Sequence, residues 1–139
     1  MNVLIDTNVV LDIVLRRTPF YADAVRIQVL SEKEIINGYI SAASVTDVFY
    51  IAVRELKDKN SVLDFLRNLL KTFRVASVTE NIINEALNLG WDDFEDSVQY
   101  VTGRSIFADC IITRNQQDFA NSGIEVLLPK QFLDRFNLS

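Results

Sequence analysis

The sequence contains no histidine in its 139 residues. This absence excludes histidine general bases, Ser-His and Cys-His nucleophile pairs, and zinc sites that use histidine ligands. The chain has only four glycines, which are too far apart to form a dinucleotide-binding fingerprint or a P-loop. Any chemistry in this chain therefore depends on carboxylates, amides, hydroxyls, lysines or arginines.

Cysteine is almost as scarce, because Cys110 is the only one and has no partner for a disulfide within the chain. Its setting, "DCIIT", is typical of a strand, so we expect it to be a small buried apolar residue. The apolar stretches are short and interrupted by charge, and the N-terminus lacks the basic region and cleavage site of a signal peptide. These features predict a cytoplasmic protein.

Basic residues are fewer than acidic residues, and the formal net charge is −5. This balance does not favour electrostatic binding of nucleic acid by the whole surface. It is compatible with a nucleic-acid enzyme whose acids are gathered in one place. With 49% apolar and 24% charged residues, the composition predicts one folded domain covering residues 1–139.

Short apolar runs alternate with segments of helical periodicity along the chain. The apolar runs predict strands at residues 2–6, 38–43, 73–78, 109–113 and 124–128. The periodic segments predict helices at residues 7–17, 19–33, 44–57, 61–72, 80–89, 95–103 and 129–136, with a short helical turn at 115–120. Strands that are apolar on both faces and alternate with helices indicate a three-layer α/β/α sandwich with a mostly parallel five-stranded sheet.

Three polar residues stand where ligands bind in such folds, beyond the carboxyl ends of the strands or at the helix starts just after them, and a further acid lies elsewhere. Asp6 closes the first strand, Asp47 lies one turn into the helix after the second, and Asn115 follows the fourth. Asp96 opens the helix that follows "WDDFE". Two carboxylates ~5 Å apart at an effective dielectric of ~20 repel each other by roughly 3 kcal/mol. A hard divalent cation offsets that repulsion, and oxygen ligands favour Mg²⁺ or Mn²⁺ over zinc.

Most of these residues also have a purely structural interpretation. "SVTD" at 44–47 is also a capping box, with Ser44 as the N-cap of a helix. "DFED" at 93–96 resembles a helix start, where the helix dipole favours acids, and Asn115 in "NQQD" can be an N-cap. Asp6 differs, because an acid directly after a buried strand is costly unless a partner meets it there. The residues alone leave both interpretations open.

Four stretches, in this order along the chain, resemble the PIN domain family: "LIDTNVVLD", "SVTDVFYI", "DFEDSVQY" and "ADCIITRNQQDF". The resemblance covers essentially the full length and is greatest to the small single-domain members that include VapC-type toxins. It implies a metal-dependent ribonuclease that uses Mg²⁺ or Mn²⁺ and leaves a 5′-phosphate and a 3′-hydroxyl. It also implies a homodimer that is held inactive by a small antitoxin protein.

The resemblance assigns the acidic residues by position. Asp6, Asp47 and Asp96 match the family's three successive acids, and Asn115 falls where many members have aspartate. Asp109 belongs to a pattern found in a subset of the family and is either a further ligand or structural. The implied catalytic residues are Asp6, Asp47, Asp96 and Asn115, and the implied metal ligands are Asp6, Asp96, Asn115 and Asp109. The chain departs from the family in having aspartate for glutamate at 47 and an uncharged oxygen ligand at 115.

Neighbouring polar residues receive supporting roles. Thr113 matches a hydroxyl that commonly supports the family's site. Thr7 and Asn8 are expected to orient the Asp6 carboxylate, although Asn8 can instead cap the following helix. Arg114 and Arg104 are predicted to contact the RNA backbone, the alternative being that they are solvated or ion-paired.

Two other functions compete with this hypothesis. An acid after the first strand also begins aspartyl-phosphate proteins, but haloacid-dehalogenase phosphatases need a second aspartate at position 8, which is asparagine here. Response-regulator receivers need an aspartate after the third strand, and "FRVASV" ends without one. The second alternative is a PIN-like scaffold that binds RNA or a protein without turnover, which Asn115 leaves open. Metal-dependent degradation of RNA distinguishes the enzyme from the scaffold.

Overall fold

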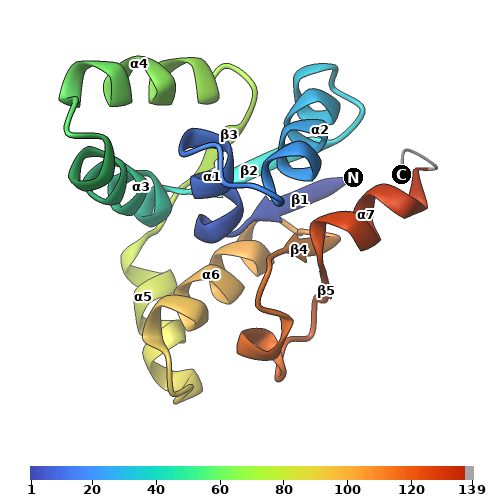
Figure 1. Cartoon of the computed structure of the whole chain (residues 1–139). Coiled ribbons are helices and arrows are strands. Elements are labelled where there is room, and N and C mark those ends of the chain that lie inside the picture. Colours follow the sequence, from blue (N-terminus) through green and yellow to red (C-terminus); the bar gives the residue numbers. More distant parts are fainter. Residues whose placement is uncertain (137–139) are drawn as a thin grey trace.

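A computed structural model describes residues 1–136, which form one five-stranded sheet with helices on both faces (Figure 1). The strand order is β3-β2-β1-β4-β5, and all four neighbouring pairs are parallel. The strands are β1 (Asn2–Ile5), β2 (Asn37–Ser41), β3 (Arg74–Ala76), β4 (Cys110–Ile112) and β5 (Glu125–Leu127). The predicted mostly parallel sheet is confirmed, and its carboxyl ends all lie along one edge.

The helices fall in the predicted segments, with shifted ends. They are α1 (Thr7–Val14), α2 (Tyr21–Glu32), α3 (Ala42–Leu56), α4 (Lys59–Leu69), α5 (Glu80–Leu89), α6 (Phe94–Ser105), α7 (Pro129–Arg135) and the 3₁₀ turn η1 (Gln116–Phe119). No helix within residues 1–136 is both long enough and apolar enough to cross a membrane.

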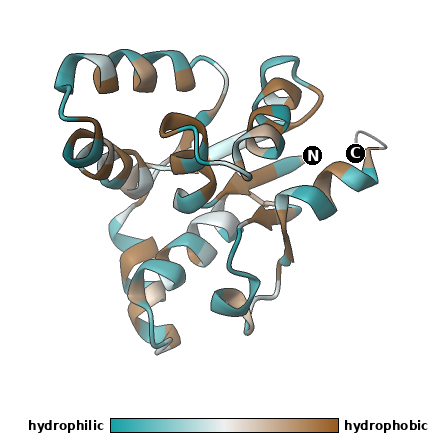
Figure 2. Ribbon diagram, viewed as in Figure 1, coloured by the Kyte–Doolittle hydropathy of each residue, from teal (hydrophilic) through white to brown (hydrophobic). Residues whose placement is uncertain are grey.

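The two faces of the sheet bury alternate residues of each strand, as the period of a β-strand requires. Val3 and Ile5 pack with α1, α2, α3, α4 and α7 in the largest apolar cluster, whereas Leu4 and Ile111 pack on the opposite face with Tyr100 of α6. Figure 2 shows the apolar strands enclosed between the helices. The three-layer α/β/α architecture is therefore confirmed. Cys110 is buried in the sheet as expected, and burial raises the pKa of its thiol to about 12.

The junctions after β1 and β2 place polar residues at the carboxyl edge. Asp6 is the N-cap of α1, with an extended backbone and a side chain that accepts a hydrogen bond from the Thr7 amide. After β2 the N-cap is Ser41, whose hydroxyl accepts from the Ser44 amide at 3.1 Å. The predicted capping box that begins at Ser44 is wrong, because α3 starts at Ala42 and Asp47 lies beyond its first turn.

Candidate functional site

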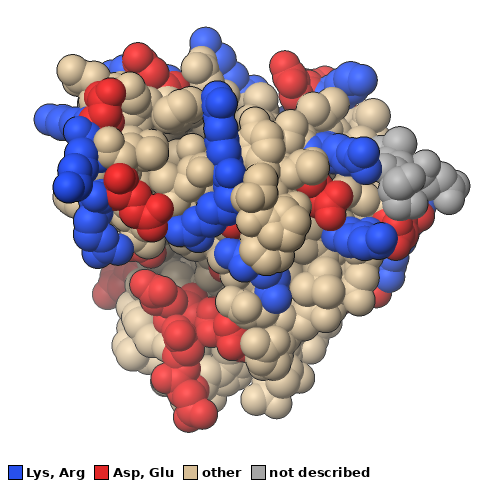
Figure 3. Space-filling view, in the orientation of Figure 1, with Lys and Arg blue, Asp and Glu red and all other residues tan. Residues whose placement is uncertain are grey.

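A cleft of about 510 Å³ opens at the carboxyl edge of the sheet, between α1, α3 and α6. Its acidic lining residues come from four separate parts of the chain: Asp6, Asp47, Glu95, Asp96 and Asp118. In Figure 3 acidic side chains form a band over the region of α5 and α6. The fold thus gathers the predicted acids on one side of the molecule, and apolar residues, including Leu11, Val78 and Phe94, also line the cleft.

Asp6 is the most buried carboxylate of the cleft, with 8% of its surface exposed. Its Oδ2 accepts hydrogen bonds from the Thr113 hydroxyl at 2.7 Å and the Asn8 amide at 3.3 Å. Its Oδ1 accepts from the Thr7 backbone at 2.9 Å and the Gln99 amide at 3.0 Å. Desolvation raises the pKa of Asp6, although these hydrogen bonds oppose the rise. The carboxylate is therefore held in one orientation, and no basic side chain within residues 1–136 forms an ion pair with it.

Asp96 lies in the first turn of α6, where its backbone amide donates to Asp93 at the N-cap. Partial burial, followed by the charges of Asp93 and Asp118, raises the pKa of Asp96 to about 7. The exposed neighbour Glu95 also has a raised pKa, because of desolvation and the charge of Asp47. These shifts show that the carboxylates of the cleft repel one another.

The structure brings together the four residues predicted as catalytic, since Asp6, Asp47, Asp96 and Asn115 all line this cleft. Asn115 precedes η1 and lines the cleft, and its side chain makes no capping hydrogen bond within residues 1–136. Its backbone N–H donates to the Thr113 hydroxyl at 3.1 Å. The proposed capping role of this side chain is therefore wrong.

The supporting residues surround Asp6 as expected. Thr113 is completely buried, and its hydroxyl donates to Asp6 while it accepts from Asn115 and, at 3.4 Å, from Asn8. Asn8 donates to Asp6, and its Oδ1 accepts from the Arg114 backbone at 3.3 Å. The alternative that Asn8 caps α1 is wrong, because Asp6 occupies the N-cap position.

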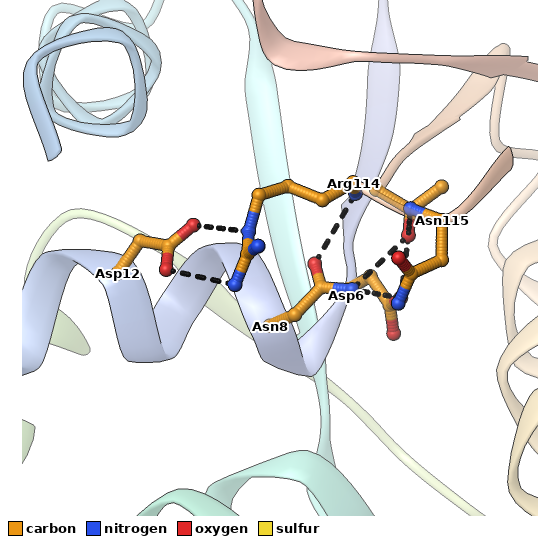
Figure 4. A network of polar contacts seen from close by, with 6 residues as sticks. Asp6, Asn8, Asp12, Arg114 and Asn115 are labelled. Carbon is orange, nitrogen blue, oxygen red and sulfur yellow. Dashed lines mark hydrogen bonds and ion pairs between the residues drawn. The ribbon is translucent and has the colours of Figure 1, made fainter. Parts of the chain in front are cut away.

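Arg114 does not face the cleft with a free guanidinium. Figure 4 shows its side chain turned along α1 to Asp12, with 2.8 Å between Nε and Oδ2. The guanidinium also lies 4.0 Å from the ring centroid of Phe20. The prediction that Arg114 binds RNA is therefore corrected: the buried Asp12 carboxylate holds this cation, in the ion-paired alternative.

Two other predicted residues lie away from the cleft. Asp109 precedes β4 at the amino edge of the sheet, where its carboxylate accepts from the Asn2 amide at 2.8 Å. Four residues of extended chain separate it from Thr113, about 13 Å, so Asp109 is structural and not a ligand of this site. Arg104 is exposed in the last turn of α6, 5.7 Å from the Tyr100 ring centroid and about 12 Å along the helix from Asp96.

Sequence reasoning missed three residues of the site. Glu95 and Asp118 line the cleft, and Gln99 donates directly to Asp6. Gln99 had a signal in the sequence, because it lies three residues after Asp96 and therefore on the same face of α6. Asp118 had a weaker signal, because "NQQD" also fits an ordinary helical turn.

The donor set fits a hard divalent cation and does not fit a metal that is held by three carboxylate, imidazole or thiolate groups. Among residues 1–136, no three His, Cys, Asp or Glu side chains lie close enough to hold one ion together. Mg²⁺ commonly keeps several waters and binds through one or two carboxylates plus substrate phosphates. Asp6 and Asp96 provide such carboxylates, and the raised pKa of Asp96 shows the excess negative charge that a cation would neutralise.

The fold and site define a class: an α/β/α protein with a parallel sheet and a carboxylate-lined cleft at its carboxyl edge. The family model described as "PIN domain" matches residues 2–117. This chain therefore belongs to the PIN domain family.

Individual proteins are similar over nearly the whole chain. Ribonuclease VapC1 of Aquifex aeolicus (strain VF5) is 24% identical over 144 residues, covering 98% of this chain and 96% of the relative. The structure of VapBC-1 from nontypeable Haemophilus influenzae has a TM-score of 0.72 at 14% identity, covering 94% of this chain and 99% of that one. A toxin–antitoxin complex from Klebsiella pneumoniae has a TM-score of 0.66 at 22% identity, covering 91% and 97%.

Proposed function

We propose that this protein is a ribonuclease that hydrolyses RNA phosphodiester bonds with Mg²⁺ or Mn²⁺, and that it is the toxin of a toxin–antitoxin pair. The observation that carries the proposal is the meeting of Asp6 and Asp96 in one cleft, with Asp47 and Asn115 on its walls. The similarity to Ribonuclease VapC1 supports the same reaction.

Three residues of the cleft have separate roles in the proposed metal site. Asp6 presents a carboxylate whose direction is set by four hydrogen bonds, and Asp96 is the second carboxylate of the metal site. Asn115 adds an uncharged oxygen donor. A bound Mg²⁺ or Mn²⁺ supplies Lewis acidity that lowers the pKa of water and offsets the charge of the phosphate.

The reaction needs a proton acceptor, and no histidine is available. Asp96 or Asp47, both of which line the cleft, accepts the proton of the attacking water. The water oxygen bonds to phosphorus while the bond to the 3′ oxygen breaks. The products are a 5′-phosphate and a 3′-hydroxyl, which takes up a proton.

Two protein partners belong to the proposal. An antitoxin is supported by the toxin–antitoxin structure to which the fold is similar. A homodimer is supported by exposed apolar side chains on α3 and α4, including Tyr50, Leu56 and Phe65. The proposal places this toxin–antitoxin pair, and its cleavage of RNA, in the cytoplasm.

The test compares labelled RNA incubated with the purified chain in Mg²⁺ or Mn²⁺ and in EDTA. We expect cleavage only with metal, and Asp6→Asn should lower the rate on the order of 100-fold. Asp109→Asn is the matched control, because Asp109 lies at the opposite edge of the sheet. RNA binding without metal-dependent cleavage would overturn the proposed enzymatic function and support the alternative of a non-catalytic PIN-like scaffold.

A further inference from the structure

Gln99 is a buried amide that joins three elements at the cleft. It lies on α6 with 5% of its surface exposed. Its Nε2 lies 3.0 Å from Oδ1 of Asp6 and 2.9 Å from Oγ of Ser44, with Oγ1 of Thr7 at 3.4 Å. One side chain therefore contacts the end of β1, the start of α1 and the start of α3.

The amide of Gln99 has only one acceptable orientation. Turning it by half a revolution would put Oε1 against Oδ1 of Asp6, so that two acceptors would face each other. In the observed orientation Oε1 is buried and has no hydrogen-bond partner within residues 1–136. An unpaired buried oxygen is costly, and natural proteins tolerate such costs mainly at functional sites. The contacts of Nε2 therefore matter more than the pairing of Oε1.

The donors around Ser44 determine where the neighbouring hydroxyl hydrogens point. The Ser41 hydroxyl donates to Oγ of Ser44 at 3.1 Å, and Gln99 donates to the same oxygen. Both acceptor positions of the Ser44 oxygen are then filled, so its own hydrogen must go elsewhere. The remaining neighbour is Oγ1 of Thr7, 2.7 Å away.

Thr7 therefore accepts from Ser44 and keeps its own hydroxyl hydrogen. No acceptor for that hydrogen occurs within residues 1–136 apart from Ser44, which is already saturated. Thr7 is half-buried and lines the cleft beside Asp6. Its hydrogen is thus available to an acceptor that enters the cleft.

We propose that Gln99 is a positioning residue, which orients the Asp6 carboxylate and directs the Thr7 hydroxyl so that Thr7 donates to a phosphate oxygen of the substrate. This inference rests on the proposed ribonuclease function. A hydroxyl donor is useful here because the carboxylates that line the cleft repel a phosphate. Chains of hydrogen bonds polarise one another, so the donors behind Thr7 strengthen its bond to the phosphate.

Variants of similar shape separate this role from simple packing. Thr7→Val removes the hydroxyl, whereas Thr7→Ser keeps it. Gln99→Met removes the donor and retains the length of the side chain, and Gln99→Asn keeps an amide that is one methylene too short. Thr102→Val is the control: Thr102 is completely buried one turn further along α6, and its hydroxyl has no hydrogen-bond partner in the part of the chain that the structure describes.

The measurements are kcat and KM for RNA cleavage with Mg²⁺, the melting temperature, and the affinity for a cleavage-resistant RNA by fluorescence anisotropy. Thr7→Val should weaken RNA binding and lower kcat/KM on the order of 10-fold, and Thr7→Ser should restore both. Gln99→Met should lower kcat/KM at least as much as Thr7→Val, because Asp6 also loses a donor. Thr102→Val should leave kcat/KM and the affinity for RNA unchanged.

A double mutant adds a direct test of the coupling. In Gln99→Met the Thr7 hydrogen is no longer directed to the cleft, so adding Thr7→Val should cost clearly less than it does in the wild type. Full additivity, or an unaffected Thr7→Val variant, would overturn the inference. If Gln99→Met does not fold, the comparison of Thr7→Val with Thr7→Ser and the measurements on Gln99→Asn still test the inference. An inactive wild type would instead overturn the proposed function.

Discussion

The guanidinium of Arg114 is paired with the carboxylate of Asp12, with 2.8 Å between Nε and Oδ2 and 3.2 Å between Nη2 and Oδ1. The side chain of Asp12 is 1% exposed, and desolvation raises its pKa even though Arg114 opposes the rise. The backbone of Arg114 also donates to Asn8, four residues before Asp12 on α1. The pair therefore fastens the loop after β4 to α1, beside the carboxylate of Asp6.

Breaking this pair should destabilise the protein strongly. Arg114→Met leaves the Asp12 carboxylate buried and unpaired, which typically costs about 3–5 kcal/mol in the free energy of unfolding. The double variant Asp12→Leu, Arg114→Met should recover most of the lost free energy of unfolding, because neither charge of the pair remains. Urea unfolding measures both.

The exposed pair of Arg67 and Asp64 provides the control for this prediction. Arg67→Met should change the free energy of unfolding by at most about 1 kcal/mol. A loss of that small size in Arg114→Met would contradict the structural role of the Asp12–Arg114 pair.

The stability of the protein should depend on the charge of Asp96. Its pKa is raised to about 7 in the folded state, above the ordinary aspartate value. A raised pKa means that this group favours folding below its unfolded pKa, near 4, and that the advantage is lost as the pH rises through 7. Asp96→Asn should therefore raise the melting temperature more at pH 8 than at pH 4.5, in EDTA. Equal effects of Asp96→Asn at both pH values would count against it, and Asp134→Asn, on the exposed side of α7, is the control.

Divalent cations should reverse that dependence. Because a cation binds the folded cleft and offsets its repulsion, Mg²⁺ or Mn²⁺ should raise the melting temperature at pH 8. At a metal concentration 100 times the dissociation constant the gain is about 2.7 kcal/mol. Asp6→Asn and Asp96→Asn should lose most of the gain, whereas Asp109→Asn should keep it. A metal-independent melting temperature in the wild type would contradict the proposed metal site.

Asp118 should influence the cleft through its charge, because it raises the pKa of both Asp6 and Asp96. Asp118→Asn should shift the pH midpoint of the Asp96 effect to a lower value and weaken Mn²⁺ binding several-fold. Isothermal titration with Mn²⁺ and melting curves across pH measure the two changes. The inference is wrong if both match those of Asp134→Asn.

Much of the fold was predictable because its signals are local. The apolar run ending in Asp6, followed at once by helical periodicity, predicts the β1–α1 unit and the position of its acid. Repetition of this pattern predicts the parallel sheet, and a parallel sheet brings its carboxyl ends to one edge. The convergence of Asp6, Asp47 and Asn115 in one cleft follows from that rule, whereas Asp96 lies on α6, which follows another helix and reaches the cleft through tertiary packing.

The errors at Arg114 and Asp109 arose where a side chain's partner is distant in sequence. Arg114 follows the active-site strand, but its guanidinium meets Asp12, 102 residues earlier in the chain. Asp109 stands only four residues before Thr113, yet a strand carries it to the opposite edge of the sheet. Proximity in sequence thus did not indicate proximity in space for either residue.

The sequence by itself determined the order of strands and helices and the acids that follow them, because strand and helix periodicity and the cost of a buried charge act over a few neighbouring residues. Only the tertiary structure decided the contacts of Asp6 with Gln99 and Thr113, 93 and 107 residues away. Those hydrogen bonds depend on the packing of α6 and β4 against β1 and α1. Such packing sets the positions and orientations of these side chains, and no local sequence pattern contains that information.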